Sequence, residues 1–204
     1  MKIEAVLFDA DGVLILPEEV FSVVYAKSHG LSPAPFEQFF RESWPAIATG
    51  KKDLKESITE NADLWQWHGT PDELLQYWFE AEDVRNEDLI ALIRGLKEQG
   101  LPCYLASDQE KYRGEYLKQV MFKDLFNGYF LSCDLGTTKS DPTFFKRVVD
   151  QLRQDNPDIN PASIVFFDDS QSKVDTARAA GINGLLYRGV EQVRQLLAAR
   201  SPQA

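Results

Sequence analysis

The chain has 204 residues, of which 44% are hydrophobic and 26% charged, a composition typical of a globular protein with room for one sizeable core plus an insert. Its net charge of −10 argues against nucleic acid as a partner, because binding to a phosphate backbone relies on clustered lysines and arginines. No apolar stretch reaches the roughly 20 residues that cross a bilayer. A predicted strand begins so soon after Met1 that no signal peptide fits before it. We therefore expect a cytoplasmic protein with no membrane partner, and the sequence leaves its oligomeric state open.

The first predicted element is an apolar strand over 4–8, which ends in Asp9-Ala10-Asp11-Gly12. Residues two apart on an extended strand share a face and lie roughly 6–7 Å apart, so Asp9 and Asp11 can address one small volume. Two acids beside a buried strand are costly without a compensating cation or hydrogen bonds. An Asp-rich turn after a strand is the plainer interpretation. The acid pair alone therefore leaves both interpretations open.

An insert over 16–85 follows this strand, with helical spacing and no convincing strand pattern. The segment 70–73, Thr-Pro-Asp-Glu, is a capping box with proline at the first helical position, so one helix is expected to begin there and to run through Trp78. We expect the aromatic residues of the insert to pack in its core more often than they contact a ligand. The tryptophans of the chain all fall in this insert: Trp44, Trp65, Trp67 and Trp78.

The chain then returns to an alternation of helices and strands. Asn86 can cap a helix that has one apolar face and stops at Gly100. The apolar run over 101–106 predicts a second strand. It is followed by Ser107-Asp108, which supplies a hydroxyl group where a strand meets a turn.

A lysine and a second acid pair follow the later strands. Lys139 comes after a predicted strand over 129–131, just before a helix that Asp141 is expected to cap. A fourth strand, over 164–167, ends in Asp168-Asp169. With a fifth run over 183–187, these short strands separated by helices indicate a parallel sheet covered on both faces.

In chain order, the acid pair, hydroxyl, lysine and second acid pair resemble the four motifs of the haloacid dehalogenase (HAD) superfamily of phosphotransferases. The segments 131–136 and 166–170 are most similar to sugar-phosphate phosphatases with a small helical cap. The resemblance implies a HAD-like phosphoric monoester hydrolase. Its fold is expected to be α/β, with a Rossmann-like doubly wound parallel sheet core over 1–15 and 86–204 and an inserted α-helical cap over 16–85.

The resemblance also implies a role for each motif residue. Asp9 is the nucleophile, whose carboxylate attacks phosphorus and forms an aspartyl-phosphate. Asp11 protonates the leaving oxygen and later deprotonates the water that hydrolyses the intermediate. Ser107 and Lys139 hold the transferring oxygens, and the lysine supplies positive charge. The implied substrate is a small phosphorylated metabolite.

Mg²⁺ is the cofactor that the resemblance implies. A carboxylate that attacks a dianionic phosphoryl group meets like-charge repulsion, which a divalent cation with a preference for hard oxygen ligands offsets. Backbone N–H groups near Ala10 and Asp108 are expected to help bind the substrate. The expected metal ligands are the carboxylates of Asp9, Asp168 and Asp169 and the backbone carbonyl of Asp11.

Two residues depart from the family pattern. Asp108 stands where relatives often have Asn, which adds a negative charge beside the phosphate oxygens. Lys173 stands where relatives typically carry Asp or Asn in support of the metal. This lysine either loosens Mg²⁺ or points to solvent while Asp175 substitutes.

Three alternatives to a phosphatase stay open. A phosphomutase of the same fold shares the chemistry but must exclude water, which the cap sequence does not reveal. A haloacid dehalogenase is disfavoured, because that branch needs neither Asp11 nor a metal. A catalytically silent member that binds a ligand or a protein is suggested by Asp108 and Lys173, and the intact Asp9, Asp11 and Lys139 count against it.

Overall fold

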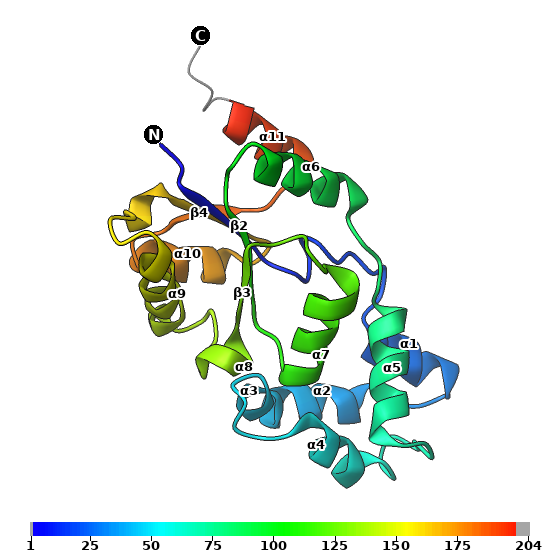
Figure 1. Ribbon diagram of the computed structural model, residues 1–204. Coiled ribbons are helices and arrows are strands. Elements are labelled where there is room, and N and C mark those ends of the chain that lie inside the picture. The colour runs from blue at the N-terminus through cyan, green and yellow to red at the C-terminus, as the bar shows by residue number, and fades with distance from the viewer. Residues whose placement is uncertain (1, 199–204) are drawn as a thin grey trace.

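The centre of the molecule is a sheet of five parallel strands in the order β3-β2-β1-β4-β5 (Figure 1). This computed structural model describes residues 2–198. The strands are β1 (Ala5–Phe8), β2 (Cys103–Ser107), β3 (Gly128–Leu131), β4 (Ile164–Asp168) and β5 (Asn183–Leu186). The chain adds strands first on one side of β1 and then on the other, which creates a topological switch point between β1 and β4. Open α/β sheets bind their ligands at such a point, outside the carboxyl ends of the strands.

Both faces of the sheet are covered by helices. Alternate residues of β1 enter different apolar clusters: Val6 and Phe8 lie in one and Leu7 lies in the other. The first cluster takes in α6 (Glu87–Glu98) and α11 (Val190–Ala198), and the second takes in α9 (Pro142–Asp155) and α10 (Gln171–Ala179). A strand buried on both faces has no polar alternation, which explains the continuous apolar runs. The doubly wound α/β fold expected from the sequence is confirmed.

The strands end at the residues with functional chemistry. Ser107 closes β2 and Asp168 closes β4, so each strand runs one residue further than its apolar run predicted. Asp9 directly follows β1. Because β1, β2 and β4 are parallel neighbours, these three side chains reach the same edge of the sheet.

Two helix starts marked in the sequence are confirmed. Thr70 accepts the backbone N–H of Glu73, and the carboxylate of Glu73 accepts the backbone N–H of Thr70, so α5 (Pro71–Ala81) begins at the next residue. Asp141 accepts the backbone N–H of Thr143 and caps α9. Asp141, the N-cap residue of α9, therefore fixes the end of the loop that carries Lys139.

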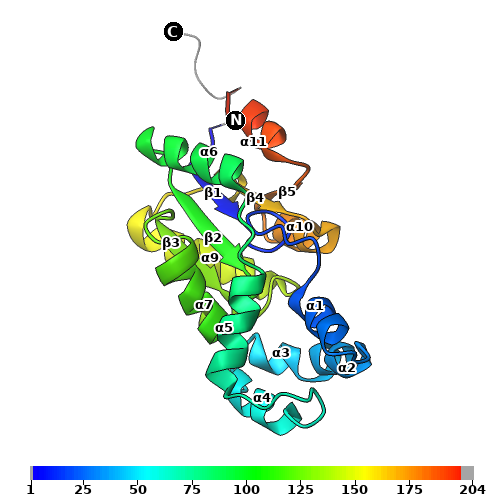
Figure 2. The same cartoon turned by 90° about the vertical axis from the view of Figure 1, so that its right-hand side faces the viewer.

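Residues 16–85, which we call the cap, are helical and contain no strand. Besides α5, the cap comprises α1 (Phe21–Ser28), α2 (Ala34–Glu42), α3 (Trp44–Ile47) and α4 (Leu54–Asn61). It lies at one end of the sheet (Figures 1 and 2) and has an apolar cluster of its own. Aromatic rings dominate that cluster; Phe36 and Trp65, for example, stack with centroids 4.9 Å apart. The domain boundaries stay a prediction, which the separate clusters support.

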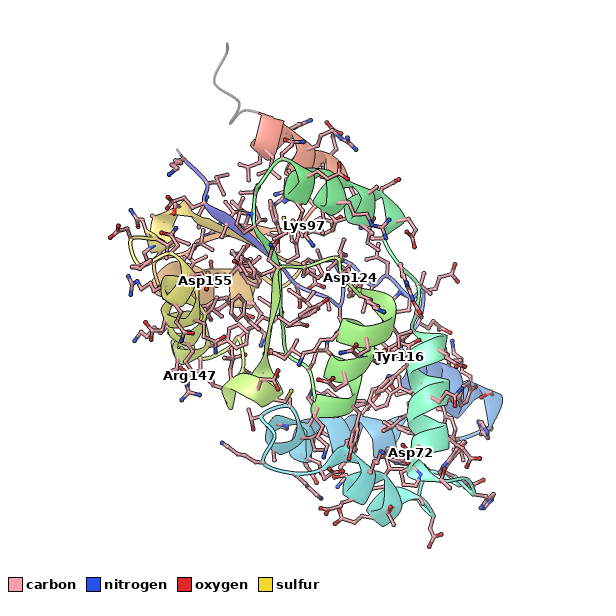
Figure 3. All side chains as sticks on the ribbon, viewed as in Figure 1. Asp72, Lys97, Tyr116, Asp124, Arg147 and Asp155 are labelled. Carbon is pink, nitrogen blue, oxygen red and sulfur yellow. The ribbon has the colours of Figure 1, made fainter. Side chains whose placement is uncertain are left out.

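The cap packs against α7 (Lys111–Tyr116). Tyr116 lies where α7 faces α5 (Figure 3), and its hydroxyl donates to Asp83 at 3.3 Å. At the other end of α7, the Tyr112 hydroxyl and the Lys111 ammonium group bond the same oxygen of Asp53, at 2.8 and 2.5 Å. Polar contacts at both ends of one helix therefore attach the cap to the rest of the molecule.

The remaining elements are short. They are the π-helix η1 (Leu117–Met121), α8 (Ser132–Leu135) and the 3₁₀-helix η2 (Pro161–Ser163). Within residues 2–198, none of the helices combines the length and the apolar composition that crossing a bilayer requires.

Candidate active site

A pocket of about 700 Å³ lies at the carboxyl ends of β1, β2 and β4, between the sheet and the cap. Seven of the eight residues predicted for the site line it: Asp9, Asp11, Ser107, Asp108, Lys139, Asp168 and Asp169. The eighth, Ala10, is buried, and its backbone N–H donates to Oδ1 of Asp9 at 2.8 Å. The predicted residues therefore come together at the switch point of the sheet.

Lys139 is the centre of the charged end of this pocket. Its Nζ lies 2.6 Å from Oδ1 of Asp9 and 2.7 Å from Oδ2 of Asp168, and these three side chains are at most 8% exposed. Burial alone would lower the pKa of Lys139, but Asp9 and Asp168 outweigh burial and hold it above its ordinary value. Lys139 is thus a buried cation held between β1 and β4.

Asp9 is buried in surroundings that disfavour its charge. Burial raises the pKa of Asp9 to about 8 against the effect of Lys139, and repulsion from Asp168 and Asp11 adds to the rise. Its Oδ1 accepts bonds from Lys139 and from the backbone N–H of Ala10. No described residue bonds Oδ2. The cluster therefore orients Oδ1 of Asp9 and leaves Oδ2 without a hydrogen bond among the described residues. The excess of negative charge favours a further cation beside Asp9.

Three carboxylates can converge on a metal ion. One oxygen each from Asp9, Asp168 and Asp169 lies within 4.8 Å of the others. Asp169 comes this close because residue 12 is a glycine with φ of +76°, where a Cβ would overlap the Asp169 carboxylate. Among the described residues, the pocket lining contains six carboxylates and three cations. Hard oxygen ligands with excess negative charge fit Mg²⁺, and a contribution from the carbonyl of Asp11 stays a prediction.

Asp11 is held in place by two residues that follow β2. Its side chain is 56% exposed, yet both oxygens are bonded: Gln109 Nε2 donates to Oδ2 at 2.6 Å and Arg113 Nη2 donates to Oδ1 at 3.3 Å. The same Gln109 Nε2 donates to the Ser107 hydroxyl at 3.1 Å. One amide therefore bridges the predicted general acid and the predicted phosphate-binding hydroxyl.

Arg113 also connects Asp11 to the cap. Its side chain is 4% exposed, and Nη1 lies 3.0 Å from Oε2 of Glu82, just after α5. This approach is an ion pair without an aligned hydrogen bond. Oε1 of Glu82 accepts the backbone N–H of Phe21, the first residue of α1. One guanidinium thus links the predicted acid to the two ends of the cap.

Asp108 and Lys173, the two departures from the family pattern, are partners. Lys173 Nζ lies 3.0 Å from Oδ2 of Asp108 and also bonds the Ser140 hydroxyl. Oδ1 of Asp108 accepts the backbone N–H of Lys139 at 2.7 Å. Asp175 bonds residues of its own helix and does not join the carboxylate cluster. Lys173 therefore neutralises Asp108 and does not simply point to solvent, and an effect of Lys173 on Mg²⁺ binding stays a prediction.

Sequence reasoning did not identify Gln109, Arg113 and Glu82. Polar residues in and beside helices are usually solvated, so nothing local marks these three as site residues. Gln109 lies in the loop between β2 and α7, and Arg113 lies in α7, so no helical spacing relates the two in the sequence. Their contacts to Asp11 appear only when distant segments pack together.

The cap side of the pocket is apolar. It is lined by Leu16, Val20, Phe40, Trp44 and Trp78, among others. Trp65 is 3% exposed and belongs to the cap cluster, as expected of a core residue. The expectation that cap rings serve the core therefore holds for Trp65, while Trp44 and Trp78 both pack on that cluster and line the pocket.

A family model for haloacid dehalogenase-like hydrolases matches residues 3–181. No curated protein matches the chain. Among similar solved structures is a HAD family enzyme from Bacteroides thetaiotaomicron, with 20% identity and a TM-score of 0.80 over 97% of this chain and 99% of that one.

Two further structures share this fold. The wild-type B. thetaiotaomicron enzyme in complex with magnesium and inorganic phosphate has 20% identity and a TM-score of 0.78, with 95% of this chain and 98% of that chain covered. A HAD phosphatase from Thermococcus onnurineus has 22% identity and a TM-score of 0.64, with 97% and 98% covered. At these identities the likeness shows a shared fold over nearly the whole of each chain.

Proposed function

The chain belongs to the haloacid dehalogenase-like hydrolase family, and from this premise we propose that it is a Mg²⁺-dependent phosphatase acting on a small phosphorylated metabolite through an aspartyl-phosphate at Asp9. The observation that carries the proposal is the buried cluster of Asp9, Lys139 and Asp168, with Asp169 beside it, at the switch point of the sheet. Similar folds are known in a magnesium and phosphate complex and in a phosphatase, which supports it.

In the first half-reaction, the carboxylate of Asp9 attacks phosphorus while the bond from phosphorus to the leaving oxygen breaks. The ammonium group of Lys139 and the hydroxyl of Ser107 hold the transferring oxygens. Asp11 donates its proton to the leaving oxygen, so the product departs as a neutral alcohol. The bonds from Gln109 and Arg113 orient both oxygens of Asp11.

In the second half-reaction, Asp11 accepts a proton from water as the water oxygen attacks the aspartyl-phosphate. The bond from phosphorus to Asp9 breaks, and Asp9 is restored as a carboxylate with release of inorganic phosphate. Asp9, Asp168 and Asp169 would hold Mg²⁺, which supplies positive charge that offsets repulsion between Asp9 and the phosphoryl group. The excess of carboxylates in the pocket supports this ligand set.

The alternatives have less support. The pairing of Asp108 with Lys173 weakens the argument for a silent member, because each of these unusual charges neutralises the other. Asp11 and Asp169 both line the pocket, which counts against a metal-free dehalogenase. No specific contact favours a phosphomutase over a phosphatase.

Phosphate release from an aryl phosphate and from a panel of phosphorylated metabolites tests the proposal, with Mg²⁺ and with chelator. We expect metal-dependent release that falls by a factor on the order of 10⁴ or more in Asp9→Asn, because the amide cannot act as the nucleophile. Asp134→Asn, at an exposed acid on α8 outside the pocket, is the matched control and keeps the rate.

Two outcomes contradict the proposal. Unchanged turnover in Asp9→Asn removes Asp9 as the nucleophile, and no release from any ester by the folded native chain removes the phosphatase activity. Thermal unfolding gives a second readout of the metal site: Mg²⁺ should raise the unfolding temperature of the native chain and should have less effect on Asp169→Asn.

A further inference from the structure

The two walls of the pocket differ in chemistry. The wall at the strand ends carries the carboxylates and Lys139, whereas the cap wall presents aliphatic side chains and rings. Leu16 and Val20, at the entry to the cap, are 43% and 53% exposed although both line the pocket. Exposed apolar side chains gathered at a pocket beside aromatic rings are typical of a binding surface.

The charged groups on the cap side of the pocket are already neutralised. Arg113 lies between Asp11 and Glu82, and Glu82 also accepts the backbone N–H of Phe21. The polar groups that remain are neutral. They are the hydroxyl of Ser22 and the indole N–H groups of Trp44 and Trp78; that of Trp78 is buried and has no acceptor among the described residues.

The charge balance of the pocket excludes a second anionic group on the substrate. Each cation in the lining is paired: Lys139 with Asp9 and Asp168, Arg113 with Asp11 and Glu82, and Lys173 with Asp108. Carboxylates outnumber these cations two to one among the lining residues. Lys139 is already assigned to the transferring phosphoryl group, so a second phosphate or a carboxylate on the substrate would lie among acids with no unpaired cation to bind it.

A polyhydroxylated leaving group fits the cap wall poorly for a related reason. Each hydroxyl taken out of water requires a new hydrogen bond, and an unpaired hydroxyl opposes binding. The few neutral groups of this wall satisfy few hydroxyls, whereas the rings of Phe40, Trp44 and Trp78 line it with apolar surface.

We propose that the substrate is the phosphate monoester of an uncharged alcohol with an apolar, ring-bearing body, and that this body binds against Phe40, Trp44 and Trp78. The inference rests on the proposed phosphatase function and names the substrate class for the same pocket. It departs from the sugar phosphates that the sequence resemblance suggests.

Phosphate monoesters of primary alcohols test this inference. Their leaving groups are of one type, so differences in kcat/KM among them report binding of the alcohol body more than the chemical step. The panel is 2-phenylethyl phosphate, glucose 6-phosphate and fructose 1,6-bisphosphate, each assayed with Mg²⁺. We expect kcat/KM for 2-phenylethyl phosphate to exceed the value for glucose 6-phosphate by about tenfold or more, the order expected for burying a ring. The bisphosphate should be the poorest substrate.

A matched pair of aromatic variants assigns the preference to the pocket. Trp44→Ala should reduce the ratio of the two kcat/KM values by about tenfold, through KM for the ring-bearing ester. Tyr77→Ala removes a ring from the same cap that does not line the pocket, and it should leave the ratio unchanged. If Trp44→Ala does not fold, inhibition of the native chain is measured instead. 2-Phenylethanol should then inhibit more strongly than glucose.

The outcomes separate the two proposals. Preference for glucose 6-phosphate or the bisphosphate, lost in Asp9→Asn, overturns the substrate class and leaves the phosphatase function standing. A ratio unchanged in Trp44→Ala, or equal inhibition by the two alcohols, also overturns the substrate class. No hydrolysis of any ester by the folded chain overturns both proposals.

Discussion

The strand-end wall of the pocket and its cap wall are held together by different forces. At the strand ends, Lys139 fixes two carboxylates at 2.6 and 2.7 Å. On the cap side, rings lie in van der Waals contact, as do Trp44 and Trp78 with centroids 6.0 Å apart. Ion pairs in a buried site set positions closely, whereas ring packing tolerates changes of shape. The rate should therefore depend on the strand-end wall, and substrate preference should depend on the cap wall.

Among the substitutions that test this comparison, removal of the central cation, Lys139, should have the largest effect. Lys139→Met leaves Asp9 and Asp168 buried without their partner, which we expect to cost about 3–5 kcal/mol of stability and to lower kcat by a factor on the order of 10²–10³. Urea unfolding and steady-state kinetics measure these effects. Mg²⁺ should restore part of the stability.

The matched control is Lys146→Met, on the exposed face of α9, which should change neither quantity. A Lys139→Met protein as stable and as active as the native chain would show that this ion-pair cluster does not organise the strand-end wall.

Arg113 joins the two walls, so its replacement should have the next largest effect. Arg113→Met frees Asp11 on one side and Glu82 on the other. We expect kcat to fall by roughly 10- to 100-fold because Asp11 loses its orientation. Arg113→Lys should recover part of the rate. Arg94→Met, at an exposed arginine on α6, is the control. An effect confined to KM would assign Arg113 to substrate binding and not to the orientation of Asp11.

Lys173→Asp tests whether residue 173 belongs to the proposed metal site. The variant places a carboxylate beside Asp108 and should lower the free energy of unfolding by about 1 kcal/mol. Mg²⁺ affinity, measured by calorimetry, should not increase, since Lys173 bonds Asp108 and not the carboxylate cluster. The double variant Asp108→Asn with Lys173→Asp should recover most of the stability. Tighter Mg²⁺ binding in the single variant would place residue 173 beside the metal.

The smallest effect is expected where the cap meets α7. Burial would raise the pKa of Asp53, but hydrogen bonds from Lys111 and Tyr112 outweigh it and lower the pKa to about 2 from the ordinary value of 3.8. A folded-state pKa below the unfolded one contributes stability above about pH 4, and this contribution is lost as the pH falls toward 2.

Asp53→Asn tests this contact, because asparagine keeps the N-cap of α4 and removes only the charge. Urea unfolding at pH 7 should show a loss of up to about 1 kcal/mol, since the Lys111 side chain in this ion pair is 58% exposed. The difference from the native chain should shrink as the pH falls through about 2 and vanish below it. A loss of equal size at both pH values would mean that the charge on Asp53 contributes nothing.

Much of the fold was predictable from local sequence. Apolar runs predicted all five strands, because a strand buried on both faces shows no polar alternation. The strand ends at Ser107 and Asp168 were predicted one residue early, since a polar residue after an apolar run resembles the first residue of a turn. The segment 70–73 marked a helix start because a capping box lies within four consecutive residues.

The candidate site was predictable only in part. The sequence pointed to Asp9, Lys139 and Asp169 because each follows a strand, and parallel strands bring their carboxyl ends to one edge. It did not pair Lys173 with Asp108, which lie far apart in the chain and meet only where the Lys173 side chain of α10 reaches the loop after β2.

The sequence by itself determined the sheet and the chemical groups at its edge, because strand propensity, caps and the order of the motifs reside in neighbouring residues. The tertiary structure alone decided which partners hold Asp11 and which tryptophans line the pocket. The contacts to Asp11 arise where the segment after β2 meets the loop after β1, and the tryptophans reach the pocket where the cap lies over it. No local pattern encodes the packing of segments so distant in sequence.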